Sequence, residues 1–213
     1  MIKTLDDQEK SIDLGRKKKI LFGWKPPPIS WLKCDIASSW DKIIYKSGAA
    51  WILRNRQGKV LLHGRNSFTG IYSKHDAYLE SWKWAIDCLK TLHFNAIVFA
   101  SEDNDLIGAI SKPSAWPSLK FYSSKMLPLL QCFLDWNVKF HAPNDIKGAK
   151  LIADSVIKGN RYYSYIAVVG IPHWLRHLFP VSTLPVFFFC TGTTQSVSLT
   201  EFEYRSQTPN RYL

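Results

Sequence analysis

The sequence predicts an α/β fold in which a mixed five-stranded sheet is flanked by helices. Three successive segments near the start of the compact region have the period of β-strands, and short connections join them. An amphipathic helical pattern follows, after which short apolar runs alternate with further helical patterns. The expected order is therefore βββ-α-β-α-β-α, with three antiparallel strands and two strands added after helices.

The first strand is predicted within Trp31–Trp40, directly after the proline run Pro26–Pro28. Residues at every second position share a face of a strand, so Asp35 and Ala37 point to the same side. The two alternating sets are Leu32, Cys34, Ile36 and Ser38 on one face, and Lys33, Asp35, Ala37 and Ser39 on the other.

A β-hairpin is predicted over Ser47–Arg65. Two apolar runs, Ala49–Leu53 and Val60–His63, flank the turn sequence Asn55–Gly58, where the glycine supplies the turn. Together with the first strand, the hairpin makes an antiparallel meander.

The pattern then changes to a helical period. Between Lys74 and Leu92 apolar residues recur every three or four positions, and Ser73 and Asp76 are capping candidates near the start. Asn95–Ser101 is a short apolar run after a helix, which favours a buried strand parallel to an existing one. The remaining expected elements are a helix beginning in Asp103–Ile110, a helix over Leu127–Trp136, a strand over Trp136–His141 and a helix over Asp145–Ile157.

Composition divides the chain into four segments. Residues 1–30 are predicted to form a basic tail that ends in an extended proline spacer. Its run Arg16–Lys19 is either a nuclear-localisation or phosphate-contacting patch or a solvated charge cluster. The folded domain is expected over 31–164, and an aromatic helical extension over 165–182 that packs back onto the domain or onto a partner. Residues 183–213 lack a coherent period and are predicted to be disordered.

The excess of basic residues indicates the class of partner. Lys and Arg number 28 against 17 Asp and Glu, a formal charge of +11 that favours nucleic acid, with a merely solvated basic surface as the alternative. The acidic, polar start is not a secretory signal, and no apolar run approaches the roughly 20 residues that span a bilayer. We therefore expect an intracellular protein, nuclear or cytoplasmic, without a membrane partner.

The spacing of cysteines and histidines favours no metal site. The four cysteines are widely separated and include no CxxC pair, which indicates reduced thiols. His173 and His177 lie one helical turn apart, but no carboxylate lies between them and no third ligand is evident. We expect both histidines to be core or surface residues.

Six strings, in this order, resemble the ribonuclease H type-1 domain and, more closely, the reverse-transcriptase-like domain of plant non-LTR retroelements. They are WLKCDIASSW, GAAWILRNRQGKVLLHGRNSF, KHDAYLESWKWAIDCLKTL, FASEDNDLIGAI, KPSAWPSL and KGAKLIADSV. The resemblance covers about residues 31–164 and implies a ribonuclease H-like fold. It also implies cleavage of the RNA strand of an RNA–DNA hybrid by two Mg²⁺ ions, which four carboxylates hold.

The four carboxylate positions of the family fall at Ala37, Tyr78, Glu102 and Lys150, of which only Glu102 is acidic. Asp35 is a candidate substitute that would hold a metal ion with Glu102, although it lies about 7 Å along the strand from Ala37. Asp154 is one turn beyond Lys150 on the same helical face. The ammonium of Lys150 disfavours a metal ion, because like charges a few Å apart in a partly buried cleft repel each other by several kcal/mol.

Four functional hypotheses follow. The first is a catalytically impaired ribonuclease H-like protein that binds RNA–DNA hybrid or RNA, with Lys33, Lys120 and Arg161 as candidate contacts beside aromatic residues. The second is an active Mg²⁺-dependent hybrid ribonuclease that uses relocated acids. The third is a protein-interaction module built on the aromatic C-terminal segment. The fourth is a translated fragment without a selected role; the sequence leaves the oligomeric state open.

Overall fold

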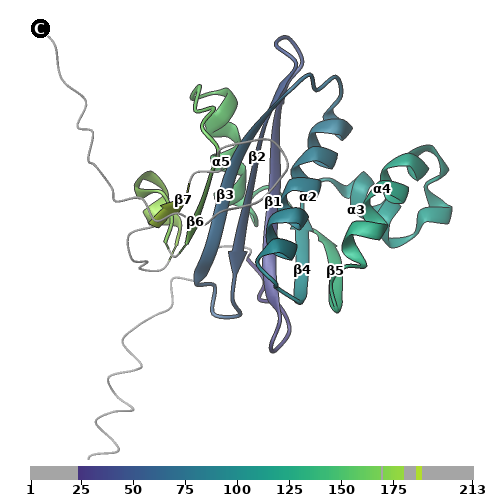
Figure 1. Ribbon diagram of the computed structural model, residues 1–213, viewed down its shortest axis with the longest axis horizontal. Helices are drawn as coiled ribbons and strands as arrows, with labels where there is room; N and C mark the ends of the chain where they lie inside the picture. The colour runs from purple at the N-terminus through teal and green to yellow at the C-terminus, as the bar shows by residue number, and fades with distance from the viewer. Residues whose placement is uncertain (1–23, 169, 180–185, 189–213) are drawn as a thin grey trace, which may run out of the picture.

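The computed structural model describes residues 24–168, 170–179 and 186–188. A single mixed sheet runs through the molecule in the order β5-β4-β1-β2-β3-β6-β7 (Figure 1). The predicted meander is confirmed, because β2 pairs antiparallel with both β1 and β3, while β4 and β5 are added in parallel beside β1. The strands are β1 Leu32–Asp41, β2 Lys46–Arg54, β3 Val60–Thr69, β4 Ala96–Ser101, β5 Asp135–Phe140, β6 Tyr165–Val168 and β7 Val186–Phe188.

The sheet has seven strands where the sequence predicted five. Strand β6 extends the free edge of β3, and β7 pairs with β6. Strand β6 lies in the segment predicted to be a helical extension, and β7 lies in the segment predicted to be disordered. Both strands were missed because runs of three or four apolar residues carry too little periodicity to identify a strand. Of the predicted helical extension, residues His173–Leu178 form a 3₁₀ helix, η3, whose Leu175 is buried. The basic run Arg16–Lys19, Cys190 and nearly all of the predicted disordered tail lie outside the described residues.

Helices cover both faces of the sheet. One face carries α2 Lys74–Thr91, α3 Asn104–Ser111 and α4 Lys120–Leu130, and the opposite face carries α5 Lys147–Ile157 (Figure 1). Two short 3₁₀ helices, η1 Pro113–Ala115 and η2 Pro117–Leu119, connect α3 to α4. No helix in the described part of the chain has the length and apolar character needed to cross a bilayer.

The helix after η2 lies earlier than the sequence predicted. Leu127–Trp136 was expected to be helical, but α4 ends at Leu130 and Trp136 belongs to β5. The helix begins seven residues earlier than expected, because its buried positions, Ser123, Met126 and Leu130, already recur at helical spacing before Leu127. The predicted cap of α2 is confirmed: the hydroxyl of Ser73 accepts a hydrogen bond from the backbone N–H of Asp76 at 3.1 Å.

A glycine allows α5 to lie directly on the sheet. A Cβ atom added at Gly48 on β2 would lie 2.4 Å from the carbonyl oxygen of Ala153 and 2.5 Å from Cβ of Val156. Neither atom is the end of a flexible side chain, so a larger residue would push the helix away. The close approach brings the α5 side chains to the end of β1.

Candidate functional site

The candidate site lies where β4 stops and β1 continues. Pairing between β1 and β4 ends at Ile36 and Ser101, whereas pairing between β1 and β2 continues to Asp41 and Lys46. One edge of β1 is therefore open beyond Ile36. Side chains from the two faces of the sheet can meet around this edge.

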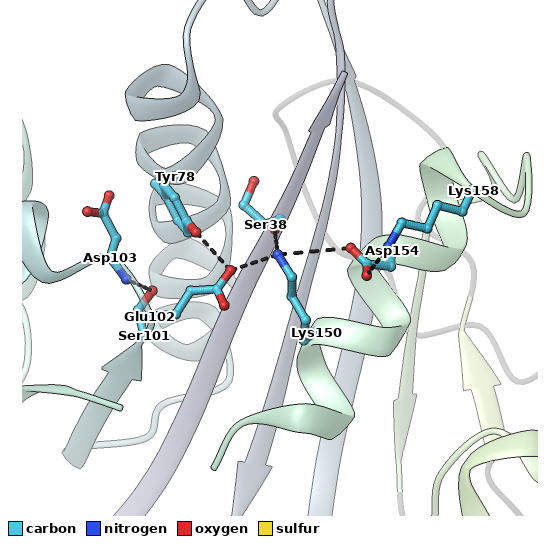
Figure 2. A network of polar contacts seen from close by, with 8 residues as sticks. All are labelled: Ser38, Tyr78, Ser101, Glu102, Asp103, Lys150, Asp154 and Lys158. Atoms are coloured by element: carbon cyan, nitrogen blue, oxygen red, sulfur yellow. Dashed lines mark hydrogen bonds and ion pairs between the residues drawn. The ribbon is translucent and has the colours of Figure 1, made fainter. Parts of the chain in front are cut away.

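Glu102, the residue directly after β4, is the centre of this meeting point (Figure 2). Its Oε1 accepts a hydrogen bond from the hydroxyl of Tyr78 on α2 at 2.8 Å. The same oxygen accepts one from Nζ of Lys150 on α5 at 2.7 Å. Three of the four positions that the resemblance indicates thus come together: Tyr78 and Lys150 from helices on opposite faces of the sheet, and Glu102 from the end of β4.

The ammonium of Lys150 also binds the open edge of β1. Its Nζ donates to the carbonyl oxygen of Ser38 at 2.8 Å and lies 3.9 Å from Oδ1 of Asp154. The second oxygen of Asp154 pairs with Lys158 at 2.8 Å. Both carboxylates of the network, which are 9% and 16% exposed, are thereby paired with lysine.

A cavity of about 300 Å³ opens at this network. It contains three lysines and two acids, so its lining has a formal charge of +1. The lining residues are Ser38, Ser39, Trp40, Lys74, Tyr78, Glu102, Lys150, Asp154 and Lys158.

Tyr78 acts as a hydrogen-bond donor in the network. Burial raises the pKa of its hydroxyl well above the usual range, and the adjacent Glu102 carboxylate raises it further. The hydroxyl therefore keeps its proton at any physiological pH. Asp103 has a separate, structural role, since its Oδ1 accepts from the N–H groups of Asp105 and Leu106 and caps α3.

The fourth family position, Ala37, is completely buried in the apolar cluster between the sheet and α5. Its neighbours in that cluster include Ala50 and Ala149. The methyl group at Ala37 therefore helps to fill the small-residue contact on which α5 rests.

Asp35 does not reach the candidate site. It is fully buried, its Oδ2 accepts a hydrogen bond from the guanidinium of Arg54, and its Oδ1 lies 3.6 Å from Nζ of Lys33. It is not among the residues that line the cavity at Glu102. The expectation that Asp35 and Glu102 would hold one metal ion together is therefore wrong, because two buried cations already use the Asp35 carboxylate.

The segment before β1 covers this buried ion cluster. The ring of Trp24 lies 4.7 Å from the Arg54 guanidinium and 5.2 Å from the Lys33 ammonium. Nζ of Lys33 also donates to the carbonyl oxygen of Lys25 at 3.1 Å, and Pro27 is buried. Trp24 and Pro27 thus fix this segment to the domain, whereas the proline run had predicted a spacer, and Lys25, Pro26 and Pro28 are exposed.

The three basic residues proposed as nucleic-acid contacts have different environments. Lys33 is 1% exposed, which corrects its assignment, since a buried ammonium cannot reach a phosphate. Lys120 is exposed at the start of α4, and Arg161 is exposed with its guanidinium 5.3 Å from the Trp174 ring. Neither lines the cavity. Sequence reasoning missed Lys74 and Lys158, although Lys158 lies one turn beyond Asp154, an observable helical spacing.

The strand order and the flanking helices are those of a ribonuclease H-like domain. The chain belongs to the reverse transcriptase-like family, whose model matches residues 35–156, more than half of the chain. No curated protein matches the chain.

Solved structures with this fold are distant in sequence. Ribonuclease H1 of Halobacterium salinarum NRC-1 is 15% identical with a TM-score of 0.54, over 61% of this chain and 98% of that one. The N-terminal RNase H domain of rv2228c from Mycobacterium tuberculosis, solved as a fusion with maltose-binding protein, is 12% identical with a TM-score of 0.52, over 61% and 94%. LC11-RNase H1 in complex with an RNA/DNA hybrid is 9% identical with a TM-score of 0.51, over 61% and 98%. These likenesses show the shared fold.

The donor set at the site does not fit a pair of Mg²⁺ ions. Such ions bind clustered carboxylate oxygens, whereas the cavity has only Glu102 and Asp154, each within ion-pair distance of a lysine. No cluster of three or more His, Cys, Asp or Glu side chains suited to a metal occurs among the residues that the structure describes. Within this network the Lys150 ammonium supplies the positive charge beside the Glu102 carboxylate.

Proposed function

We propose that this chain is a nucleic-acid-binding ribonuclease H-like protein of retroelement origin in which metal-dependent cleavage has been lost. The observation that carries the proposal is the 2.7 Å contact between Nζ of Lys150 and Oε1 of Glu102. A tethered cation stands beside the one acid that remains at the four family positions. A Mg²⁺ ion at the same place would meet this fixed positive charge in a site of low exposure.

Charge supports the binding half of the proposal. The chain carries a net +11, and the cavity brings Lys74, Lys150 and Lys158 to the open edge of β1. Phosphate contacts by lysine need neither a metal ion nor a catalytic carboxylate. LC11-RNase H1 was solved with an RNA/DNA hybrid, so a hybrid is the first ligand to test. The likeness to plant non-LTR retroelement domains and an intracellular location, nuclear or cytoplasmic, belong to the same proposal.

The cleavage test compares the parent chain with a triple variant, Ala37→Asp, Tyr78→Glu and Lys150→Asp. We expect the parent to bind a labelled RNA–DNA hybrid, more weakly as salt rises, and to leave it intact in Mg²⁺ or Mn²⁺. Cleavage by the parent that Glu102→Ala abolishes would overturn the proposal in favour of an active ribonuclease with relocated acids. Absence of hybrid binding at low salt would refute the binding half.

A thermal readout tests the metal site without relying on activity. A ligand that binds only the folded state raises the melting temperature. We expect Mg²⁺ to leave the melting temperature of the parent unchanged and to raise that of the triple variant. Lys147→Asp is the control for the lysine substitution, because it makes the same charge change as Lys150→Asp on an exposed residue of α5 outside the cavity.

A further inference from the structure

A pair of exposed tyrosines lies beside the lysine-lined cavity. Tyr45 ends the turn between β1 and β2, and Tyr72 lies just before α2. Their ring centroids are 5.3 Å apart with the planes tilted by 48°, and the residues are 49% and 74% exposed. A tyrosine pair this exposed contributes little apolar burial to folding.

The backbone holds this pair in place. The carbonyl oxygen of Tyr45 accepts a hydrogen bond from the N–H of Ile71, and the carbonyl oxygen of Ile71 accepts one from the indole N–H of Trp40, both at 2.9 Å. Trp40 is itself a cavity residue, as is Lys74, two positions after Tyr72. The segments that carry the two tyrosines are therefore hydrogen-bonded to, or directly precede, residues that line the cavity.

Tyr45 adopts a backbone conformation that is unfavourable for a bulky residue. Its φ is +50°, in the left-handed region where glycine and asparagine are the usual residues and a bulky side chain is strained. Strain of this kind concentrates at functional positions, where the surrounding structure maintains it. In this conformation the Tyr45 ring lies at the surface, in contact with the ring of Tyr72.

The charges around the tyrosines select a polyanion. Two exposed lysines lie near the pair in the sequence, Lys42 three residues before Tyr45 and Lys74 two residues after Tyr72, and Lys46 follows Tyr45 directly. One acid, Asp41 at the end of β1, lies beside the turn, where its Oδ1 accepts from the N–H groups of Ile43 and Ile44, so Lys42 and Lys46 outnumber it. An aromatic surface with an excess of neighbouring lysines suits stacked bases joined by phosphates.

We infer that Tyr45 and Tyr72 form a stacking platform for an unpaired nucleobase, so that the protein prefers nucleic acid with a single-stranded extension over a blunt duplex. The inference rests on the proposed binding function and adds the form of the ligand. Stacking requires an accessible base face, which a paired base inside a duplex lacks.

The test uses the full chain and two labelled RNA–DNA hybrids, one blunt and one with a short single-stranded extension, in fluorescence anisotropy titrations. We expect the parent to bind the extended hybrid about ten-fold more tightly, within the range for stacking one base on an aromatic side chain. Both affinities should fall as salt rises, and the ratio should decrease only in part, because the extension adds phosphate contacts whereas stacking itself does not depend on salt.

Single substitutions identify the platform. Tyr72→Ala should bring the ratio close to one and leave the affinity for the blunt hybrid unchanged. Tyr45→Gly should do the same, and it keeps the turn foldable because glycine tolerates the positive φ. Tyr163→Ala is the matched control: Tyr163 is 78% exposed, similar to Tyr72, and lies outside the cavity, so the ratio should persist.

The outcomes separate this inference from the proposed function. Binding of both hybrids with equal affinity, or a preference that survives Tyr72→Ala, overturns the platform and leaves the binding function standing. Absence of binding to either hybrid at low salt overturns both. Self-association of the parent that Tyr72→Ala abolishes, measured by sedimentation velocity, would assign the surface to a second copy of the chain and overturn the platform as well.

Discussion

Replacing Asp35 by alanine tests whether this carboxylate is a structural counter-ion. Asp35 is 0% exposed, and its two cationic partners, Arg54 and Lys33, are 2% and 1% exposed. Removing one partner of a buried ion pair leaves an uncompensated charge and costs about 3–5 kcal/mol. Because two cations share this carboxylate, we expect the loss to lie at the upper end of that range.

The assay is urea unfolding followed by the fluorescence of the nine tryptophans. Asp35→Ala should lower the midpoint without changing the slope, and should lower the melting temperature by on the order of 10 °C. The matched control is Asp135→Ala on β5, which removes an exposed carboxylate and should change the free energy of unfolding by less than about 0.5 kcal/mol.

A second variant separates charge from volume. Lys33→Met, Asp35→Leu and Arg54→Met together replace the buried charges by apolar groups of similar size, and should recover most of the lost stability. If Asp35→Ala unfolds within about 1 kcal/mol of the parent, Asp35 is not the counter-ion of the cluster and its proposed role is wrong.

Three further predictions concern pH, packing and binding. Burial lowers the pKa of His63 to about 3 in the folded state, against about 6.5 in the unfolded state. The neutral imidazole therefore contributes to stability above pH 6.5, and this contribution declines as the pH falls toward 3. Acidification to pH 4.5 should lower the free energy of unfolding by about 2–3 kcal/mol, and His63→Gln should remove that part of the pH dependence of urea unfolding. Gly48→Ala should destabilise the fold by about 1–3 kcal/mol in the same assay, because its Cβ would meet the Ala153 carbonyl; an unchanged midpoint would contradict the tight α5 contact. Lys74→Ala should weaken hybrid binding and lower the salt slope of the affinity by about one, whereas Lys112→Ala, at the end of α3 and outside the cavity, should leave the slope unchanged.

Much of the fold could be predicted because its signals are local. Alternation along β1, the turn at Gly58 and the helical period of α2 each arise within about 20 residues. The two last strands could not be found this way, since β6 is four residues long and becomes a strand by pairing with β3, about a hundred residues earlier. Isolated short segments of that kind carry no period of their own.

The candidate site was predicted in part. The order and spacing of the six strings placed Tyr78, Glu102 and Lys150 at family positions, and the structure brings these three side chains together. The same reasoning offered Asp35 as a metal ligand and Lys33 as a nucleic-acid contact. Both assignments failed because the register of β1 and β2 places Arg54 opposite Lys33 and beside Asp35. This pairing cannot be deduced from the local sequence.

The sequence alone determined the fold class, because the periods of strands and helices are properties of the chain itself, and its resemblance to the family indicated which residues stand at the four family positions. Only the tertiary structure decided what those residues contact. Lys150 neutralises Glu102 across 48 positions of sequence, since β4 ends one residue before the acid and Gly48 lets α5 lie close to the sheet. Contacts of this kind depend on where distant segments stop and how closely they pack, which no local pattern encodes.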